Sequence, residues 1–138
     1  MIPQALTEAC ERNKFVWHRE SSQDVDFAFD DLMIEQQGEF WQFSRVYCLQ
    51  FVSETLPFEM ADFLEDDGQI SDLVEYAHRE LQIPNDLIPI STYEAESLYC
   101  VRPGTSQLVL LTPSKGGEAW DEQEISSSFF TFMLEHLR

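Results

Sequence analysis

The stretch LIPISTYEAESLYCVRPGTSQLVLLT, residues 87–112, decides the fold class of this chain. Three of its segments, at 87–92, 97–102 and 108–112, are rich in leucine, β-branched and aromatic residues and predict short strands. The residues PGTS at 103–106 predict the turn of a hairpin between the last two strands. Strands that follow one another without a crossover helix pair antiparallel. We therefore expect a mostly antiparallel sheet.

Helical periodicity flanks this sheet on both sides in the sequence. In residues 23–37, for example, Val25, Phe29, Leu32 and Met33 recur at helical spacing and predict one buried face, with Gly38 as the end of the helix. Elsewhere Pro57 and Ser71 suit the start of a helix. The predicted helices cover residues 4–13, 23–37, 57–66, 72–82 and 127–137.

Two more strands and a loop complete the expected architecture. The apolar run at 40–52 is predicted to be a strand covered on both faces, and residues 15–17 a short strand. The polar stretch TPSKGGEAWDEQE at 112–124 reads as a long loop around Gly116 and Gly117. No linker divides the chain. We expect one α+β domain spanning residues 1–138, with a mostly antiparallel sheet and helices packed against it.

Composition excludes several classes of partner. The 138 residues contain 8 Lys and Arg against 26 Asp and Glu, which gives a net charge of −18. Binding to nucleic acid depends on Lys and Arg that displace counterions from phosphates, so this balance argues against it. It argues equally against docking on anionic membranes. A hydrophobic content of 43%, with 13% aromatic residues, indicates a folded chain because disordered acidic chains lack aromatics.

The negative charge is concentrated in the first half of the chain. Between residues 20 and 75, fifteen Asp and Glu face Arg45 as the one basic residue. Either this charge serves solubility alone, or it forms a field that captures a basic partner. The candidate partner-binding residues are Asp24, Asp26, Asp30, Asp31, Glu35, Asp62, Glu65, Asp66 and Asp67. Neighbouring aromatics are either interface anchors or core; they are Phe27, Phe29, Phe58, Phe63 and Trp120.

Motifs for catalysis, metal binding or cofactor binding are missing from the sequence. His18, His78 and His136 are far apart, and neither HExxH nor CxxC occurs. Placing Gly68 at the sixth position of a calcium loop puts Phe63 and Val74 where carboxylates are required. We therefore expect no catalytic residue, no metal and no cofactor. The adjacent carboxylates at 30–31 and 65–67 leave a small carboxylate-dependent enzyme as an alternative.

Targeting signals are also missing. Residues 1–15 lack the basic and apolar regions of a signal peptide, and no apolar run is long enough to cross a membrane. Cys10, Cys48 and Cys100 are isolated and odd in number, as expected for reduced thiols that fill the core. The sequence therefore predicts a cytoplasmic protein.

Four motifs resemble the SUKH superfamily, which includes the fungal Smi/Knr cell-wall regulators and many bacterial immunity proteins. They are LP…FL…G at 56–68, IP…LIPI at 83–90, SLYCV at 97–101 and SFFTFM at 128–133. The chain departs from the family in having Ala95-Glu96 where a Gly-Asp pair is usual. The resemblance implies an α+β scaffold without catalytic residues whose bacterial members neutralise a toxin, often a nuclease or nucleic-acid deaminase, by occlusion. It transfers no functional residue to a numbered position.

Together these features predict a non-catalytic immunity-type protein that binds a cognate, basic toxin domain. A toxin that acts on nucleic acid is itself basic, and an acidic partner complements it. A DNA-mimic inhibitor is a variant of this hypothesis. The alternatives are an acidic interaction scaffold with a non-toxin partner and the carboxylate-dependent enzyme. The sequence leaves the oligomeric state open.

Overall fold

Four strands form one antiparallel sheet in which the order along the chain is also the order in space. A computed structural model describes residues 1–51, 54–56, 58–93, 96–117 and 119–137. The strands are β1 (Ile88–Pro89), β2 (Leu98–Arg102), β3 (Gln107–Pro113) and β4 (Trp120–Ser126). Each strand pairs antiparallel with the next, and residues 103–106 form the turn between β2 and β3. The predicted sheet type and hairpin are confirmed.

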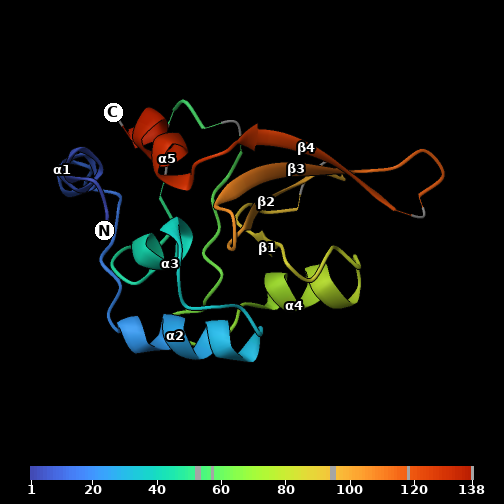
Figure 1. Cartoon of the computed structure of the whole chain (residues 1–138), viewed down its shortest axis with the longest axis horizontal. Coiled ribbons are helices and arrows are strands. Elements are labelled where there is room, and N and C mark those ends of the chain that lie inside the picture. The colour runs from blue at the N-terminus through green and yellow to red at the C-terminus, as the bar shows by residue number, and fades with distance from the viewer. Residues whose placement is uncertain (52–53, 57, 94–95, 118, 138) are drawn as a thin grey trace.

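Helices lie on both sides of this sheet (Figure 1). They are α1 (Gln4–Arg12), α2 (Ser22–Asp31), α3 (Glu39–Ser44), α4 (Asp72–Arg79) and α5 (Phe129–Leu137). One face of the sheet, with Val101 and Leu108, joins the main core formed with α1, α2, α3 and α5. The other face, with Cys100 and Val109, packs on Ala77 of α4 in a smaller core. The chain is therefore one compact α+β domain.

Helices α4 and α5 lie within the predicted ranges. The Ser71 hydroxyl accepts a hydrogen bond from the Val74 N–H at 3.3 Å and caps α4 as a serine at this position should. The start of α5 is fixed by Glu39, whose carboxylate accepts bonds from the Ser128 hydroxyl and the Phe130 N–H at 2.8 Å each. This contact attaches α5 to α3.

The predicted strand at 40–52 is wrong in its described part, residues 40–51, because the first part is helix α3; Val52 lies outside the described residues. Phe40, Phe43 and Tyr47 are buried, and their spacing of three and four residues is that of a helix. In an almost continuous apolar run, the two-residue period of a strand fits equally well, so the sequence pattern could not decide between a helix and a strand. Tyr47 then forms an isolated antiparallel bridge with His18. Among the described residues this bridge is the only β-pairing near the strand predicted at 15–17, which does not form.

The predicted helix at 57–66 is also wrong in its described part, residues 58–66; Pro57 lies outside the described residues. Met60 forms a bridge with Ser91, and Leu64 forms one with Ile70. The N–H of Ala61 donates to the Ile90 carbonyl at 2.9 Å, so the backbone pairs with a distant segment and not with its own preceding turn. Long-range pairing overrides the local helix signal here.

Helix α2 ends at Asp31, six residues before the predicted end. Met33 has φ +59°, its N–H donates to the Asp30 carbonyl, and the Ile34 N–H donates to the Phe29 carbonyl at 2.8 Å. These two bonds make a Schellman end in which methionine occupies the left-handed position that glycine usually takes. Gly38 does not end α2 but precedes α3. Met33, predicted to be buried, is exposed.

Strand β4 was not predicted. Its residues 121–124 are Asp, Glu, Gln and Glu, all exposed, and such residues are rare in strands. Backbone hydrogen bonds to β3 hold this segment as a strand although its side chains have low strand propensity. An edge strand also tolerates charges on its surface. The segment predicted to be a loop therefore contains the fourth strand.

Candidate functional site: the acidic side around α2

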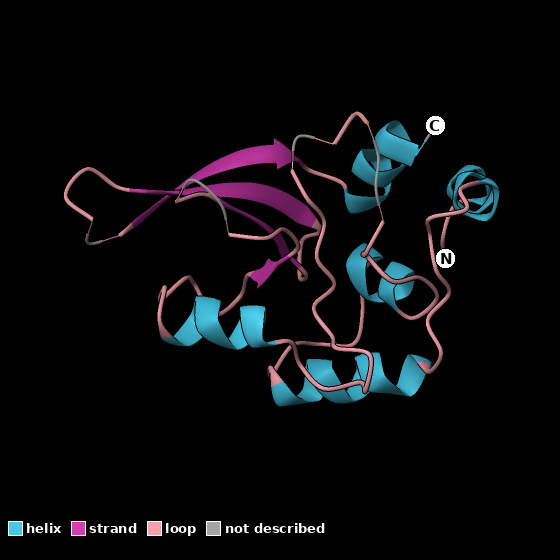
Figure 2. Cartoon of the chain, turned by 180° about the vertical axis from the view of Figure 1, so that it is seen from behind, coloured by secondary structure: helices cyan, strands magenta, loops and turns pink. Residues whose placement is uncertain are grey.

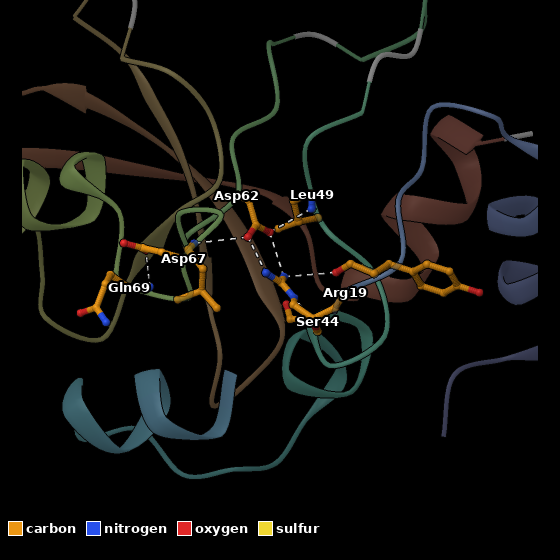
Figure 3. Close-up of polar contacts among 8 residues, drawn as sticks. Arg19, Ser44, Leu49, Asp62, Asp67 and Gln69 are labelled. Atoms are coloured by element: carbon orange, nitrogen blue, oxygen red, sulfur yellow. Dashed lines mark hydrogen bonds and ion pairs between the residues drawn. The ribbon is translucent and has the colours of Figure 1, made fainter. Parts of the chain in front are cut away.

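Asp62 is buried in a salt bridge and is removed from the predicted partner-binding set. Its carboxylate accepts hydrogen bonds from both terminal nitrogens of Arg19, at 2.6 and 2.9 Å, and from the Leu49 N–H at 2.9 Å (Figure 3). The two side chains are only 6% and 3% exposed. Arg19 also donates to the carbonyls of Ser44 and Tyr47. The pair joins three segments of the chain, at residues 19, 44–49 and 62, so its role is structural.

Asp26 is likewise committed to the fold. It accepts hydrogen bonds from the indole N–H of Trp41 at 2.8 Å and from Arg45 at 3.1 Å. Arg45 in turn lies over the Trp41 ring, 4.9 Å from its centre. These contacts attach α2 to α3 and neutralise the Asp26 charge, which leaves little for a partner.

The turn that contains Glu65, Asp66 and Asp67 lies directly beside the start of α2. A Cβ atom built on Gly68 would stand 2.6 Å from a carboxylate oxygen of Asp24, so a side chain at position 68 would displace that carboxylate. Gly68 also has φ +86°, which a side chain disfavours. Asp67 accepts a bond from the Gln69 N–H, which closes the turn (Figure 3). Carboxylates about forty residues apart in the sequence thus gather on one side.

A hollow of about 270 Å³, here called the Trp17 hollow, lies where this turn meets α2. Trp17 is 70% exposed and lies on its wall. Glu20, Asp24, Glu65 and Asp66 also line it, and Arg19 is its only Lys or Arg among the described residues. Because Arg19 is already paired with Asp62, the hollow is negative.

The outward-facing residues of α2 form a second feature, here called the outer stripe: Gln23, Phe27, Asp30 and Asp31. Phe27 is 63% exposed, and its helical neighbours three and four residues away include Asp24 and Asp31. Asp30 accepts a bond from the Gln36 amide at 2.9 Å. Within the described part of the chain, no Lys or Arg forms an ion pair with Asp24, Asp30 or Asp31. The stripe is an aromatic side chain surrounded by uncompensated charge.

Beyond the end of α2 lies a groove of about 590 Å³, here called the Met33 groove. Leu32, Met33 and Ile34 form one wall, and Pro103 and Gly104 of the β2–β3 turn form another. Carboxylates line it as well; they are Asp31, Glu35 and Asp86. The predicted residue Glu35 therefore lies here and not on the helix.

Helix α2 runs along an edge of the molecule away from the sheet, as Figure 1 and the reverse view in Figure 2 both show. Of the nine predicted residues, Asp26 and Asp62 are engaged in salt bridges within the fold. The other seven lie along this edge or in the turn beside it; these are Asp24, Asp30, Asp31, Glu35, Glu65, Asp66 and Asp67. We call these seven the acidic side. Charge density in the sequence located the region, but it could not separate the paired aspartates from the exposed ones.

Several residues of the site carry no signal that distinguishes them in the sequence. Phe27 was one of five candidate anchors. Of the three phenylalanines Phe27, Phe29 and Phe63, the last two are buried and only Phe27 is exposed. Trp17 was predicted to lie in a strand and Met33 on the buried face of a helix, whereas both are exposed. Asp86 comes from a separate segment, and only tertiary structure brings it to the groove.

The thiols are free and unreactive in character. Cys10 and Cys100 are buried and Cys48 is half-buried. Burial raises the pKa of Cys10 to about 12 and raises the pKa of Cys100 as well, so both stay protonated at neutral pH. Among the described residues, no group of three or more His, Cys, Asp and Glu could hold a metal ion. No helix there is long and apolar enough to span a membrane.

The chain was compared with models of protein families, with curated proteins and with solved structures, and none of the three comparisons found a match. The geometry of the acidic side therefore has to support a function by itself.

Proposed function

We propose that this chain is a non-catalytic immunity-type protein that binds a basic protein domain through the acidic side and so blocks that domain's activity. The observation that carries the proposal is the outer stripe. Phe27 is exposed in its centre, and the surrounding aspartates have no cationic partner within the described residues. An exposed aromatic side chain that a partner can bury, with a polar rim around it, suits a protein interface.

Electrostatics supports a basic partner. Concentrating like charges weakens a fold, and this chain does so along one edge although Lys and Arg occur elsewhere. Asp24, Asp30 and Asp31 have no Lys or Arg within reach on α2, whereas exposed Glu75 on α4 is paired with Arg79. A partner that supplies positive charge removes this repulsion, which speeds association and favours the bound state.

The assignment to toxin immunity rests on the resemblance to the SUKH superfamily. Such a partner is a toxin domain that acts on nucleic acid, since its substrate requires a basic surface. A basic partner that is not a toxin would fit the same acidic side, so an inhibition assay has to separate the two. The carboxylates at 30–31 and 65–67 are exposed, which gives them none of the apolar burial that usually prepares a catalytic acid.

The test is calorimetric titration of the chain, in low and high salt, with a basic toxin domain taken from any toxin gene found next to the gene for this chain. The variant Asp24→Lys/Asp30→Lys/Asp31→Lys reverses the charge of the two aspartates of the outer stripe and of Asp24 beside them. We expect it to weaken binding by about a hundredfold in low salt, and less in high salt because the interaction is screened. Inhibition of the toxin's nuclease or deaminase activity should weaken in parallel.

The matched control reverses three exposed carboxylates away from the acidic side, Glu8→Lys/Asp121→Lys/Glu135→Lys. It changes the net charge by the same amount, so it should retain most of the affinity if position matters. Equal losses in the two variants would reduce the interaction to net charge and contradict the proposed surface. Tight binding without inhibition would support a scaffold in place of an immunity protein.

A further inference from the structure

The Met33 groove is an apolar depression with a negative rim. Its walls come from two distant segments, the end of α2 and the β2–β3 turn. They are held close together, since a Cβ atom on Gly38 would stand 2.9 Å from the Pro103 carbonyl and the Ser106 hydroxyl accepts a bond from the Glu39 N–H. The groove is therefore a fixed feature of the fold.

Met33 is displayed in this groove at a conformational cost. Its side chain is 93% exposed, and its φ of +59° disfavours any residue with a Cβ. Its neighbours Leu32 and Ile34 pack partly against the main core, so the wall beneath Met33 is anchored. Glycine would satisfy the Schellman end better. A flexible, polarisable thioether that is exposed on an apolar wall is well suited to contact another protein.

The charges around the groove restrict what can occupy it. Asp31 and Glu35 have no ion pair with a described residue, and Asp86 shares Arg102 with Glu122. His78 uses its Nε2 for a hydrogen bond to the Leu87 carbonyl at 2.7 Å. Among the described residues, no Lys or Arg lines the groove. Anionic ligands are therefore disfavoured, and a second copy of a chain with a net charge of −18 would be repelled.

We propose that the Met33 groove receives one large apolar side chain of the basic partner, from a segment in which Lys or Arg residues flank that side chain. The apolar group would pack on Leu32, Met33 and Pro103, and the flanking cations would meet Asp31, Glu35 and Asp86. This inference rests on the proposed function, because the groove is continuous with the outer stripe through Asp31. The groove adds specificity to an attraction that charge alone leaves broad.

The test uses two synthetic peptides as probes. Both contain two Lys-Arg pairs, and the residue between the pairs is Leu in one peptide and Ser in the other. Fluorescence anisotropy gives the affinity of each for the full chain. We expect the Leu peptide to bind about tenfold more tightly, since partial burial of a leucine contributes that much. In spectra of ¹³C-methyl methionine, the Met33 signal should shift with the Leu peptide, whereas equally exposed Met1 should not respond.

Gly104 offers a way to close the groove without disturbing the fold. A Cβ atom there meets nothing within 4 Å, so Gly104→Trp adds a bulky side chain at the groove wall. It should abolish the preference for the Leu peptide, because the added side chain occupies the space that leucine would fill. The control, Thr131→Trp, places the same side chain on an exposed position of α5, on the other side of the molecule from α2 (Figure 1), and should keep the preference.

The outcomes separate the groove from the acidic side. Equal affinity of the two peptides for the native chain would overturn the groove while charge-dependent binding of both still supported the proposed function. Persistence of the tenfold preference in Gly104→Trp would place the apolar contact elsewhere and would also overturn the groove. Failure of both peptides to bind would contradict both proposals.

Discussion

Removing the Asp62 carboxylate should cost the fold a large part of its stability. In Asp62→Ala, the guanidinium of Arg19 stays buried without its counter-charge, and the N–H groups of Leu49 and Leu64 lose their acceptor. Breaking a buried ion pair by removing one partner costs about 3–5 kcal/mol. Domains of this size have about 5–15 kcal/mol in total. We therefore expect the Tm to fall by about 10 °C or more.

Urea denaturation followed by tryptophan fluorescence measures this change, and a double-mutant cycle assigns it. The cycle compares the double variant Arg19→Met/Asp62→Leu with the single variants Arg19→Met and Asp62→Leu. Because the double variant removes both charges, it should be more stable than the summed losses of the two single variants predict, by about 2 kcal/mol or more. The control Glu75→Ala breaks an exposed pair with Arg79, whose side chains are 55% and 73% exposed, and should cost less than about 0.5 kcal/mol. A loss of similar size in Asp62→Ala and Glu75→Ala, or strict additivity in the cycle, would refute the reasoning.

Three further predictions concern other parts of the chain. Met33→Gly should raise the free energy of unfolding by about 1 kcal/mol, because glycine takes the left-handed φ without strain; urea denaturation tests this, and a decrease would contradict it. Hydrogen bonds from Tyr47 and then His18 lower the pKa of Glu11 below its ordinary 4.5, so its contribution to stability is complete above that pH and is lost as the pH falls through the lower folded value. Denaturation curves of Glu11→Gln and the native chain should therefore differ at neutral pH and converge in acid; a constant difference would exclude this linkage. Cys10, whose pKa burial raises to about 12, should react with a thiol reagent only when the chain unfolds, and rapid labelling of the native chain would show that it opens.

The sheet was predictable because its signals are local. The turn at 103–106 and the two strands beside it alternate as the register requires, with Cys100 opposite Val109 on one face. Ser71 and the apolar spacing that follows it likewise define α4 within a few residues. In these segments propensity, pattern and turn chemistry agree, and the tertiary structure leaves them as predicted.

The errors fall where local signals conflict with long-range contacts. Residues 39–44 are apolar enough to satisfy either period, and packing of Phe40 and Phe43 in the main core decides for a helix. Residues 58–66 lose their predicted helix to backbone pairing with residues 90–92 and to the salt bridge of Asp62 with Arg19. Residues 120–126 form β4 because their backbone pairs with β3. Their acidic side chains give no indication of this pairing in the sequence.

The sequence by itself determined the fold class and the region of excess charge, because hydrophobic period and net charge are properties of neighbouring residues. Only the tertiary structure decided which carboxylates are paired within the fold, since Asp62 and Asp26 look no different from Asp30 in the sequence until Arg19 and Arg45 are brought beside them. It also decided that Phe27 and Met33 face outward and that Asp86 joins Glu35 at one groove. The residues of a surface come from segments that are distant in the sequence, so their spacing along the chain does not show that they are neighbours in the fold.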